Sequence, residues 1–329
     1  MQNDTPIHIV LAADQRYFDG LYVTAGTMAR YATESGRIVW NVLDGGIDDD
    51  SFGELSDCIL SNHRSSEIRR VKFDVRTVRQ MPEYHGSRMT FARLFLPSIL
   101  PSTETVIYCD TDFTWHADVA KLWSLRSSEK CIQAVVDGYI DKYGGGAERD
   151  WCKRNGFAFR EDEYFCAGLM IMNLDKIRKL GYEDLFAQAL RNHPDVIYAD
   201  QTILNAVLPR EEISLLPKEW ERFASTLDEH SLERPFALHY AAQPPWRMSF
   251  LNDATMLWFS DMAKLRGTGV WQELRRFHSP AMIVSSRAVF LLVTSCSLLS
   301  ALFESLMRLI GHPGVGDYCQ RNKIIHERD

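Results

Sequence analysis

The sequence predicts an α/β fold with a mostly parallel central sheet and a C-terminal helical extension. The chain has 329 residues, 46% of them apolar and 25% charged, which is an ordinary globular composition with enough length for a large core. Short β-rich apolar runs alternate with stretches of helical spacing from residue 7 onward. After Trp246 the strand signals stop and the remainder has a helical pattern. We therefore expect a catalytic domain over residues 1–250 and a helical extension over 251–329.

Apolar runs rich in β-branched residues mark the predicted strands. The first strand is followed by a helical pattern, "GLYVTAGTMARYA". Strands are expected at Ile7–Ala13, Arg37–Gly46, Glu67–Asp74, Thr105–Asp110, Cys131–Gly138, Tyr164–Leu174 and Pro235–Ala241, with helices near Asp50–Ser61, Met89–Leu100 and Asp200–Leu208. Strands that alternate with helices form parallel sheets covered on both faces, and ligands bind beyond the C-terminal ends of such strands.

The charge of the chain is unevenly distributed. Residues 264–329 contain nine basic and five acidic residues, an excess of four, so the net charge of −7 implies −11 for the rest. An acidic body argues against nucleic-acid binding, whereas a basic tail suits an anionic surface.

The cysteines and the N-terminus both indicate a cytoplasmic protein. The seven cysteines never occur as Cys-x-x-Cys, so neither a disulfide framework nor a zinc knuckle is expected. The first residues, "MQNDTPIHIVLAAD", lack the basic start and apolar stretch of a signal peptide. We expect reduced thiols.

Two carboxylates directly follow a predicted strand, in the stretch "TVIYCDTDF". Residues i and i+2 of a strand face the same side, so Asp110 and Asp112 would point at one place at its C-terminal end. Two negative charges at such a short distance repel each other unless a positive charge lies between them, which favours a divalent cation. The alternative is turn chemistry, in which Asp110, Thr111 and Asp112 bond their own backbone. The tripeptide alone leaves both open.

Four other residues have both a functional and a structural interpretation. Asp14 follows the first strand, where it would either face a ligand crevice or serve as a turn or cap residue. His239 lies on the last strand, as a metal ligand or as a satisfied core histidine. Asp200 precedes an apolar helical run, which is also an N-cap position, and Arg93 is either functional or a solvated arginine on a half-apolar helix.

Six motifs occur in an order that resembles the family 8 glycosyltransferases, which include bacterial lipopolysaccharide galactosyl- and glucosyltransferases and glycogenin. The chain lacks Gly-x-Gly-x-x-Gly after the first strand and has no Gly-Lys-Ser/Thr, so a dinucleotide fold and a P-loop lose support. The resemblance covers roughly residues 7–250. It rests on "AADQRY", "TFARLFLP", "VIYCDTD", "YFCAGLMIMNLDK", "DQTILN" and "HYAAQPPW".

The resemblance implies a GT-A type nucleotide-sugar-binding fold and a retaining transfer of galactose or glucose. The donor would be a UDP-hexose, and the acceptor a saccharide or lipid-linked oligosaccharide of envelope lipopolysaccharide or oligosaccharide synthesis. Asp110, Asp112 and His239 would hold Mn²⁺ or Mg²⁺, which neutralises the diphosphate as a Lewis acid.

The resemblance also implies roles for individual residues. Asp14 and Tyr17 match positions that contact uracil, and Arg93, Asp110 and Asp200 match residues that hold donor-sugar hydroxyls. Gln201 matches a glutamine near the anomeric carbon, and Asp137 a position near the acceptor. Ala12, Thr111, Cys166 and Ala167 complete the expected donor site.

Three departures from the family pattern bear on sugar identity and rate. Cys166 stands where the family commonly has asparagine, which removes an amide that would bond the sugar. The loop after His239, "AAQPPW", is shorter than the family's and lacks its lysine. Arg16 stands where asparagine is frequent, and is a candidate to replace part of that missing positive charge.

Retention leaves two mechanisms open. A double displacement needs a carboxylate nucleophile, for which Asp200 and Asp137 are the candidates. A front-face substitution would instead use the leaving phosphate to deprotonate the acceptor, with Gln201 stabilising the separated charges, and we favour it because an amide is a poor nucleophile.

Two other classes remain as alternatives to a glycosyltransferase. A nucleotidyltransferase would show a glycine- and lysine-rich loop near its first strand, which is absent. A non-catalytic sugar-nucleotide binder fits Cys166 and the missing lysine.

Two segments outside the motifs have open interpretations. The three consecutive glycines of Asp141–Asp150 predict irregular structure, either a plain surface loop or a mobile acceptor lid. Residues 287–311 predict an amphipathic helix that is too short in its uncharged part, Ala288–Phe303, to span a membrane. It would pack on the domain or in a dimer, or else bind the inner face of the cytoplasmic membrane peripherally.

Overall fold

The computed structural model describes residues 5–279, apart from 34–35, 80, 82, 85–86, 144, 227–234, 242–243 and 248–252. The chain forms two compact units. The first runs to Arg222 and also includes Pro235–His239, whereas the second takes Phe223–Arg234 and the chain from Tyr240 onward. The expected boundary near residue 250 stays a prediction.

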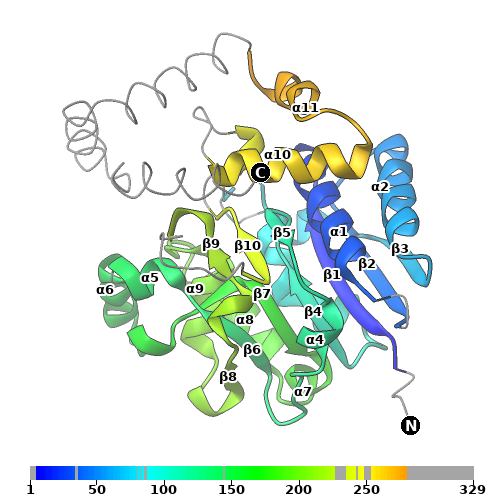
Figure 1. The fold of residues 1–329 in the computed structure, drawn as a ribbon. Coiled ribbons are helices and arrows are strands. Elements are labelled where there is room, and N and C mark those ends of the chain that lie inside the picture. Colours follow the sequence, from blue (N-terminus) through cyan, green and yellow to red (C-terminus); the bar gives the residue numbers. More distant parts are fainter. Residues whose placement is uncertain are drawn as a thin grey trace, which may run out of the picture. The chain divides into compact units, whose positions relative to one another are not determined.

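A seven-stranded sheet forms the core of the first unit (Figure 1). Its order is β3-β2-β1-β4-β7-β6-β8, and β7 alone runs antiparallel to its neighbours. The prediction of a mostly parallel sheet is therefore confirmed. The strands are β1 Ile7–Ala13, β2 Ile38–Asp44, β3 Ser66–Lys72, β4 Thr105–Cys109, β6 Ile132–Val136, β7 Phe165–Asn173 and β8 Ile213–Leu215.

The register of this sheet brings four chain segments to one edge. Ile9 pairs with Ile107, so the ends of the parallel strands β1 and β4 emerge together. Because β7 is antiparallel, its beginning lies at the same edge, where Leu169 pairs with Cys109 and Phe165 with Val136. The residues that follow β1, β4 and β6 and those that begin β7 are therefore neighbours.

Helices connect these strands, and the apolar runs explain where they pack. Eleven residues of α1 are buried, and Asp48 caps α2 by accepting a hydrogen bond from Ser51 N at 2.7 Å. The helices of the first unit are α1 Phe18–Tyr31, α2 Asp49–Asn62, α3 Leu96–Ile99, α4 Val119–Trp123, α5 Gly138–Tyr143, α6 Gly146–Asn155, α7 Leu174–Lys179, α8 Tyr182–Asn192 and α9 Ala199–Val207. Its 3₁₀ helices are η1 Gln15–Tyr17, η2 Val75–Val78, η3 Met89–Phe95, η4 Glu161–Glu163, η5 Arg210–Glu212 and η6 Lys218–Trp220.

A second, small sheet positions the last predicted strand. Its order is β5-β10-β9, with β5 at Phe113–Trp115, β10 at Ala237–His239 and β9 at Arg222–Phe223. β5 and β10 are antiparallel, and Phe113 lies opposite His239. The backbone of β5 is tied to α1, because Thr24 Oγ1 donates to Phe113 O at 3.0 Å. This pairing brings His239 next to the segment that contains Asp112.

The structure differs from the expectations in three places. Helices α5 and α6 occupy most of the glycine-rich stretch that we expected to be irregular. Asp137 caps α5 by accepting hydrogen bonds from the amides of Tyr139 and Ile140, both at 2.9 Å. The helix expected at Met89–Leu100 begins as the 3₁₀ helix η3 and continues as α3, and the strand expected at Pro235–Ala241 is only three residues long.

The second unit is helical where the structure describes it. It contains η7 Ala224–Thr226, η8 Pro245–Arg247, α10 Asp253–Arg266 and α11 Val270–Phe277. Trp246, Trp258 and Phe277 pack as an aromatic cluster, and Trp258 is fully buried. Within the described residues, no helix has the length and apolarity required to cross a bilayer. The predicted amphipathic helix at 287–311 lies outside the described residues.

Candidate active site

Three side chains converge at the C-terminal edge of the central sheet. The ligand atoms of Asp110, Asp112 and His239 lie within 4.8 Å of one another. Asp110 follows β4, where its amide donates to Gly168 O at 2.7 Å, and Asp112 immediately precedes β5. The two carboxylates therefore meet through the link between β4 and β5, and not along one strand as expected.

The chemistry of this cluster fits a divalent cation. Asp112 Oδ1 is buried and lies 3.2 Å from His239 Nε2, but no well-aligned hydrogen bond reaches it from the described residues. Burial raises the pKa of Asp110, against the opposing effect of Arg93. Burial lowers the pKa of His239, but the carboxylates of Asp112 and Glu221 outweigh it and raise this pKa to about 10. An under-bonded carboxylate oxygen beside a second carboxylate and an imidazole suits Mn²⁺ or Mg²⁺.

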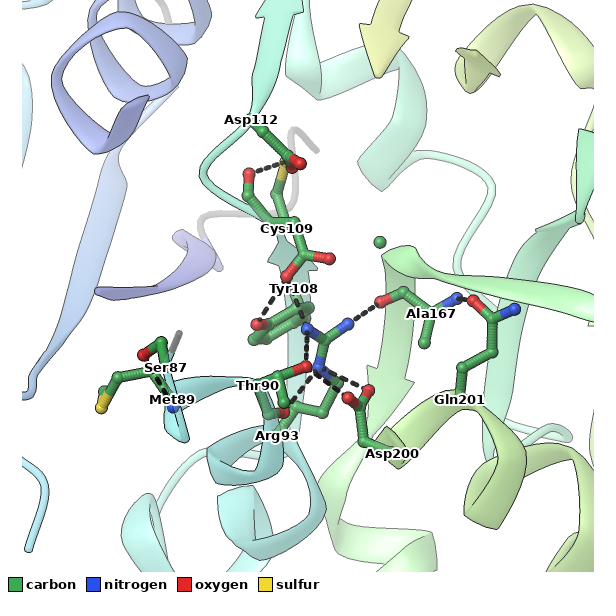
Figure 2. A network of polar contacts seen from close by, with 12 residues as sticks. Ser87, Met89, Thr90, Arg93, Tyr108, Cys109, Asp112, Ala167, Asp200 and Gln201 are labelled. Carbon is green, nitrogen blue, oxygen red and sulfur yellow. Dashed lines mark hydrogen bonds and ion pairs between the residues drawn. The ribbon is translucent and has the colours of Figure 1, made fainter. Parts of the chain in front are cut away.

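Arg93 joins the cation cluster to the neighbouring part of the site (Figure 2). Its side chain is 3% exposed, so the alternative of a solvated arginine is wrong. Nη2 lies 2.6 Å from Asp110 Oδ1, Nε lies 2.9 Å from Asp200 Oδ2, and Nη1 donates to Ala167 O. The guanidinium also lies over the ring of Tyr108, 4.4 Å from its centre. One buried arginine thus fixes two of the predicted site carboxylates.

Asp200 lies inside the first turn of α9, so the alternative interpretation as an N-cap is wrong. It accepts a hydrogen bond from Thr90 Oγ1 and is paired with Arg93. Burial raises the pKa of Asp200 to about 6, although Arg93 opposes this shift. The preceding Ala199 has a φ of 49°, in the left-handed region that residues other than glycine seldom adopt. Such strain is typical of functional sites, where the surrounding contacts maintain it.

Gln201 and Asp137 form a second chain of polar contacts. Gln201 Nε2 donates to Asp137 Oδ2 at 2.9 Å, and Gln201 Oε1 accepts from Ala167 N at 2.9 Å. Because Asp137 Oδ1 accepts two amides of α5, both of its oxygens are bonded. Burial raises the pKa of Asp137. The structure therefore brings both predicted residues together and fixes which way the amide of Gln201 points.

Asp14 and Tyr17 lie at the end of β1, at the same edge of the sheet. The Asp14 carboxylate caps η1 and accepts from Arg16 N at 3.0 Å and from Ser87 Oγ at 2.8 Å. It also pairs with the Arg16 side chain at 3.1 Å. The capping interpretation of Asp14 thus holds in the structure, and the uracil contact stays a prediction. Ala12 and Thr111 are buried at the ends of β1 and β4.

Cys166 is buried at the beginning of β7 and faces the histidine. Its Sγ lies 3.9 Å from His239 Nδ1, and burial raises the pKa of this thiol well above its usual range. The five described cysteines are all free thiols, as predicted. Cys296 and Cys319 lie outside the described residues.

Sequence reasoning missed Thr90, Tyr108 and Glu221. Glu221 Oε1 lies 2.7 Å from His239 Nδ1, 18 residues away in the chain. Tyr108 OH donates to Asp110 at 3.0 Å from within an apolar strand. The alternation in "VIYC" was available as a signal for Tyr108, because i and i+2 share a side, but no local pattern marks Glu221 or Thr90.

Comparisons with known proteins identify the family of the chain. The model of the family described as "Glycosyl transferase family 8" matches residues 8–248. General stress protein A of Bacillus subtilis (strain 168) is 26% identical over 226 residues, which cover 66% of this chain and 74% of that protein. The Homo sapiens xylosyl- and glucuronyltransferase LARGE2 is 30% identical over 165 residues, covering 46% of this chain and only 22% of that protein.

Solved structures show the same fold. Galactosyltransferase LgtC in complex with donor and acceptor sugar analogs superposes with a TM-score of 0.68 at 21% identity, over 83% of this chain and 100% of LgtC. The bifunctional glycosyltransferase WbbM in its apo form gives a TM-score of 0.68 at 20% identity, over 85% of this chain and 53% of WbbM. These likenesses show a GT-A fold. Since the family model matches most of its length, the chain belongs to glycosyl transferase family 8.

Proposed function

We propose that this glycosyltransferase is metal-dependent and retaining, and that it moves galactose or glucose from a UDP-hexose to a saccharide acceptor. Membership of the family implies a nucleotide-sugar donor and a saccharide acceptor. The observation that supports the finer proposal most directly is the convergence of Asp110, Asp112 and His239 within 4.8 Å at the ligand edge of the sheet.

The donor would lie across the cluster and the Arg93 network. Asp110, Asp112 and His239 would hold Mn²⁺ or Mg²⁺, which when bound neutralises the diphosphate and assists its departure. Arg93 orients Asp110 and Asp200, whose carboxylates are then fixed to accept hydrogen bonds from sugar hydroxyls. Asp14 and Tyr17 would contact the uracil, and the backbone at Ala12, Thr111, Cys166 and Ala167 would line the remaining donor surface.

The contacts of the two candidate nucleophiles favour front-face substitution. Asp200 is committed to Thr90 and Arg93, and Asp137 to two amides and Gln201. Attack by Asp137 on the anomeric carbon would disrupt hydrogen bonds at both of its oxygens, and attack by Asp200 would separate its carboxylate from Arg93. In the proposed reaction the bond from that carbon to the diphosphate oxygen breaks, and the leaving group keeps the electron pair. The acceptor oxygen bonds on the same face, and its proton passes to the departing phosphate oxygen.

Gln201 would stabilise the separated charges without forming a bond. Its orientation is set at both ends of the amide, so no reorganisation is needed when charge develops. Asp137 lies next to it, and would be near the acceptor as the resemblance to the family implies. An acceptor of envelope lipopolysaccharide or oligosaccharide synthesis, presented by a lipid at the cytoplasmic face of the membrane, fits the basic, amphipathic sequence of residues 264–329.

A donor screen tests this function. The purified full-length chain is incubated with UDP-galactose, UDP-glucose and other UDP-sugars, with Mn²⁺, Mg²⁺ or EDTA, and released UDP is measured. We expect release with one UDP-hexose, dependent on the cation and insensitive to addition of other nucleotides. Absence of turnover with every donor, or full turnover in EDTA, would contradict the proposal.

The second candidate is a non-catalytic sugar-nucleotide binder. The observation in its favour is Cys166, which occupies a position where the family commonly has an amide and which is turned toward His239. Calorimetry with UDP separates the two functions. Tight binding of UDP with no turnover of any donor would support the binder.

A further inference from the structure

Glu221 is a buried carboxylate whose best contact is the histidine of the cation cluster. Its side chain is 1% exposed and that of His239 is 5% exposed. Glu221 Oε1 lies 2.7 Å from His239 Nδ1, while the other ring nitrogen, Nε2, faces Asp112 at 3.2 Å. The two nitrogens of one ring are therefore directed at two different carboxylates. Burial of a carboxylate is costly unless it is paired and hydrogen-bonded, and His239 offsets this cost at Oε1, whereas Oε2 of Glu221 is buried with no hydrogen-bond partner among the described residues.

The surroundings of the ring hold it in this orientation. Phe113 stacks on the imidazole with ring centres 4.2 Å apart and planes 14° from parallel. Gly168 also borders the ring, and a Cβ there would lie 2.6 Å from His239 Cε1 and 2.9 Å from Glu221 Oε1. The absence of a side chain at Gly168 is what allows the carboxylate and the ring to meet.

Cys166 completes the contact. Its Sγ lies 3.9 Å from His239 Nδ1, and the ligand atoms of Cys166, Glu221 and His239 all lie within 4.8 Å of one another. The thiol is also close enough to accept from Gly168 N, at 3.4 Å. The cysteine thus supports the carboxylate in the same small space, which gives a physical role to a residue that departs from the family pattern.

We propose that Glu221, supported by Cys166, is a positioning residue that keeps the Nδ1 proton on His239 and so leaves Nε2 free to bind the cation. The proposal rests on the proposed metal site of Asp110, Asp112 and His239. A histidine that ligates through one nitrogen commonly donates its other N–H to a carboxylate, which fixes the tautomer and the ring orientation. Glu221 does not touch the donor or the cation in this scheme.

The test measures Mn²⁺ binding to the full-length chain, by the electron paramagnetic resonance of free Mn²⁺, in four variants. Glu221→Ala removes the acceptor, and Glu221→Gln keeps the shape and an amide oxygen. Asp112→Asn removes a proposed ligand. Glu148→Gln is the matched control, because Glu148 is also a buried carboxyl but bonds Tyr164 at 2.8 Å. We expect Glu221→Ala to weaken Mn²⁺ binding about 10- to 100-fold, Glu221→Gln to weaken it less, and Glu148→Gln to leave it unchanged.

A second readout separates positioning from mere folding. Nitrogen-15 histidine spectra of the Mg²⁺-loaded wild type should show His239 with its proton on Nδ1, and Glu221→Ala should lose this single tautomer. If Asp112→Asn loses Mn²⁺ but Glu221→Ala keeps wild-type affinity and tautomer, the positioning role is wrong and the metal site stands. If Asp112→Asn itself keeps wild-type affinity, the metal site is wrong. Zn²⁺ binding that needs Cys166 and Glu221 but not Asp112 would also overturn the positioning role, because these residues would then be a metal centre of their own.

Discussion

At the scale of residues, the site depends on polar side chains that hold one another in fixed directions. Arg93 bonds both Asp110 and Asp200, and Asp137 bonds Gln201, so each group is oriented before any ligand arrives. Such preorganisation is where most electrostatic stabilisation of a transition state comes from. Substitution of Gln201 and of Asp137 tests it.

Replacing Gln201 or Asp137 should slow transfer without removing donor binding. Gln201→Ala should lower the turnover number about 10²-fold, by loss of one stabilising group. In Asp137→Asn the oxygen of the new amide would keep the hydrogen bonds from Tyr139 N and Ile140 N, and its NH₂ group would then face the NH₂ group of Gln201. Two donors cannot bond each other, so the Gln201 amide must turn over and lose its hydrogen bond from Ala167 N. The same direction of effect is expected. Single-turnover kinetics measure the rate, and mass spectrometry under those conditions should find no sugar attached to Asp200 or Asp137. A trapped adduct would establish double displacement instead.

Glu148 should make stability depend on pH. Burial raises its pKa above the usual 4.5, against the hydrogen bond from Tyr164. The unfolded chain therefore loses this proton at lower pH than the native protein, and the free energy of unfolding falls as pH rises from 4.5 through the native pKa. The slope for one such group is at most about 1.4 kcal/mol per pH unit. Urea titrations between pH 4 and 8 should show that the free energy of unfolding of Glu148→Gln increases relative to that of the wild type as pH rises. A constant difference would mean that Glu148 titrates normally.

At the scale of elements, close backbone approach around β7 and β10 determines the geometry. Gly168→Ala would force a Cβ into His239 and Glu221, so it should destabilise the protein by about 1–3 kcal/mol and weaken Mn²⁺ binding. Gly53→Ala in α2 is the control, because nothing lies within 4 Å of its Cβ and alanine favours helices by roughly 1 kcal/mol. Thermal unfolding and Mn²⁺ titration of both variants measure this. Equal behaviour of the two would show that the site tolerates a side chain at residue 168.

Elements with a strong local pattern could be predicted from the sequence, and those fixed by distant contacts could not. The seven predicted strands all exist, and most are apolar runs, although β3 is the charged segment "SEIRRVK" paired with β2. By contrast, β5 has three residues and is defined by its pairing with β10. The prediction of irregular structure for the glycine-rich stretch was wrong because the cap of Asp137 on α5 and the burial of Trp151 on α6 outweigh glycine's poor helix propensity. Asp110, Asp112 and His239 could be predicted from motif order, but Glu221 could not, since its partner is defined only by the fold.

At the scale of the whole molecule, the uneven charge predicts where the enzyme works. We expect residues 264–329 to bind anionic membranes, with leucines facing the acyl chains and arginines meeting lipid phosphates. In the full-length chain, Leu298→Glu with Leu302→Glu should abolish flotation with liposomes that contain phosphatidylglycerol. The control, Ser297→Glu with Ser300→Glu, adds the same charge on the opposite face of the predicted helix and should still float with these liposomes. If neither the wild type nor either variant floats with these liposomes, the segment does not bind anionic membranes and the predicted helix has another partner.

We expect UDP-sugar turnover to depend on a cation bound by Asp110, Asp112 and His239. Asp112→Asn removes one anionic ligand and leaves a side chain of the same shape. Asp118→Asn, nearby in the chain, is the control, because asparagine can replace an aspartate that caps α4 through Ala120 N. The measurement is UDP release from the preferred UDP-hexose as a function of Mn²⁺. We predict that Asp112→Asn loses the cation-dependent rate at every tested concentration while Asp118→Asn matches the wild type. Wild-type turnover and an unchanged Mn²⁺ titration in Asp112→Asn would contradict it.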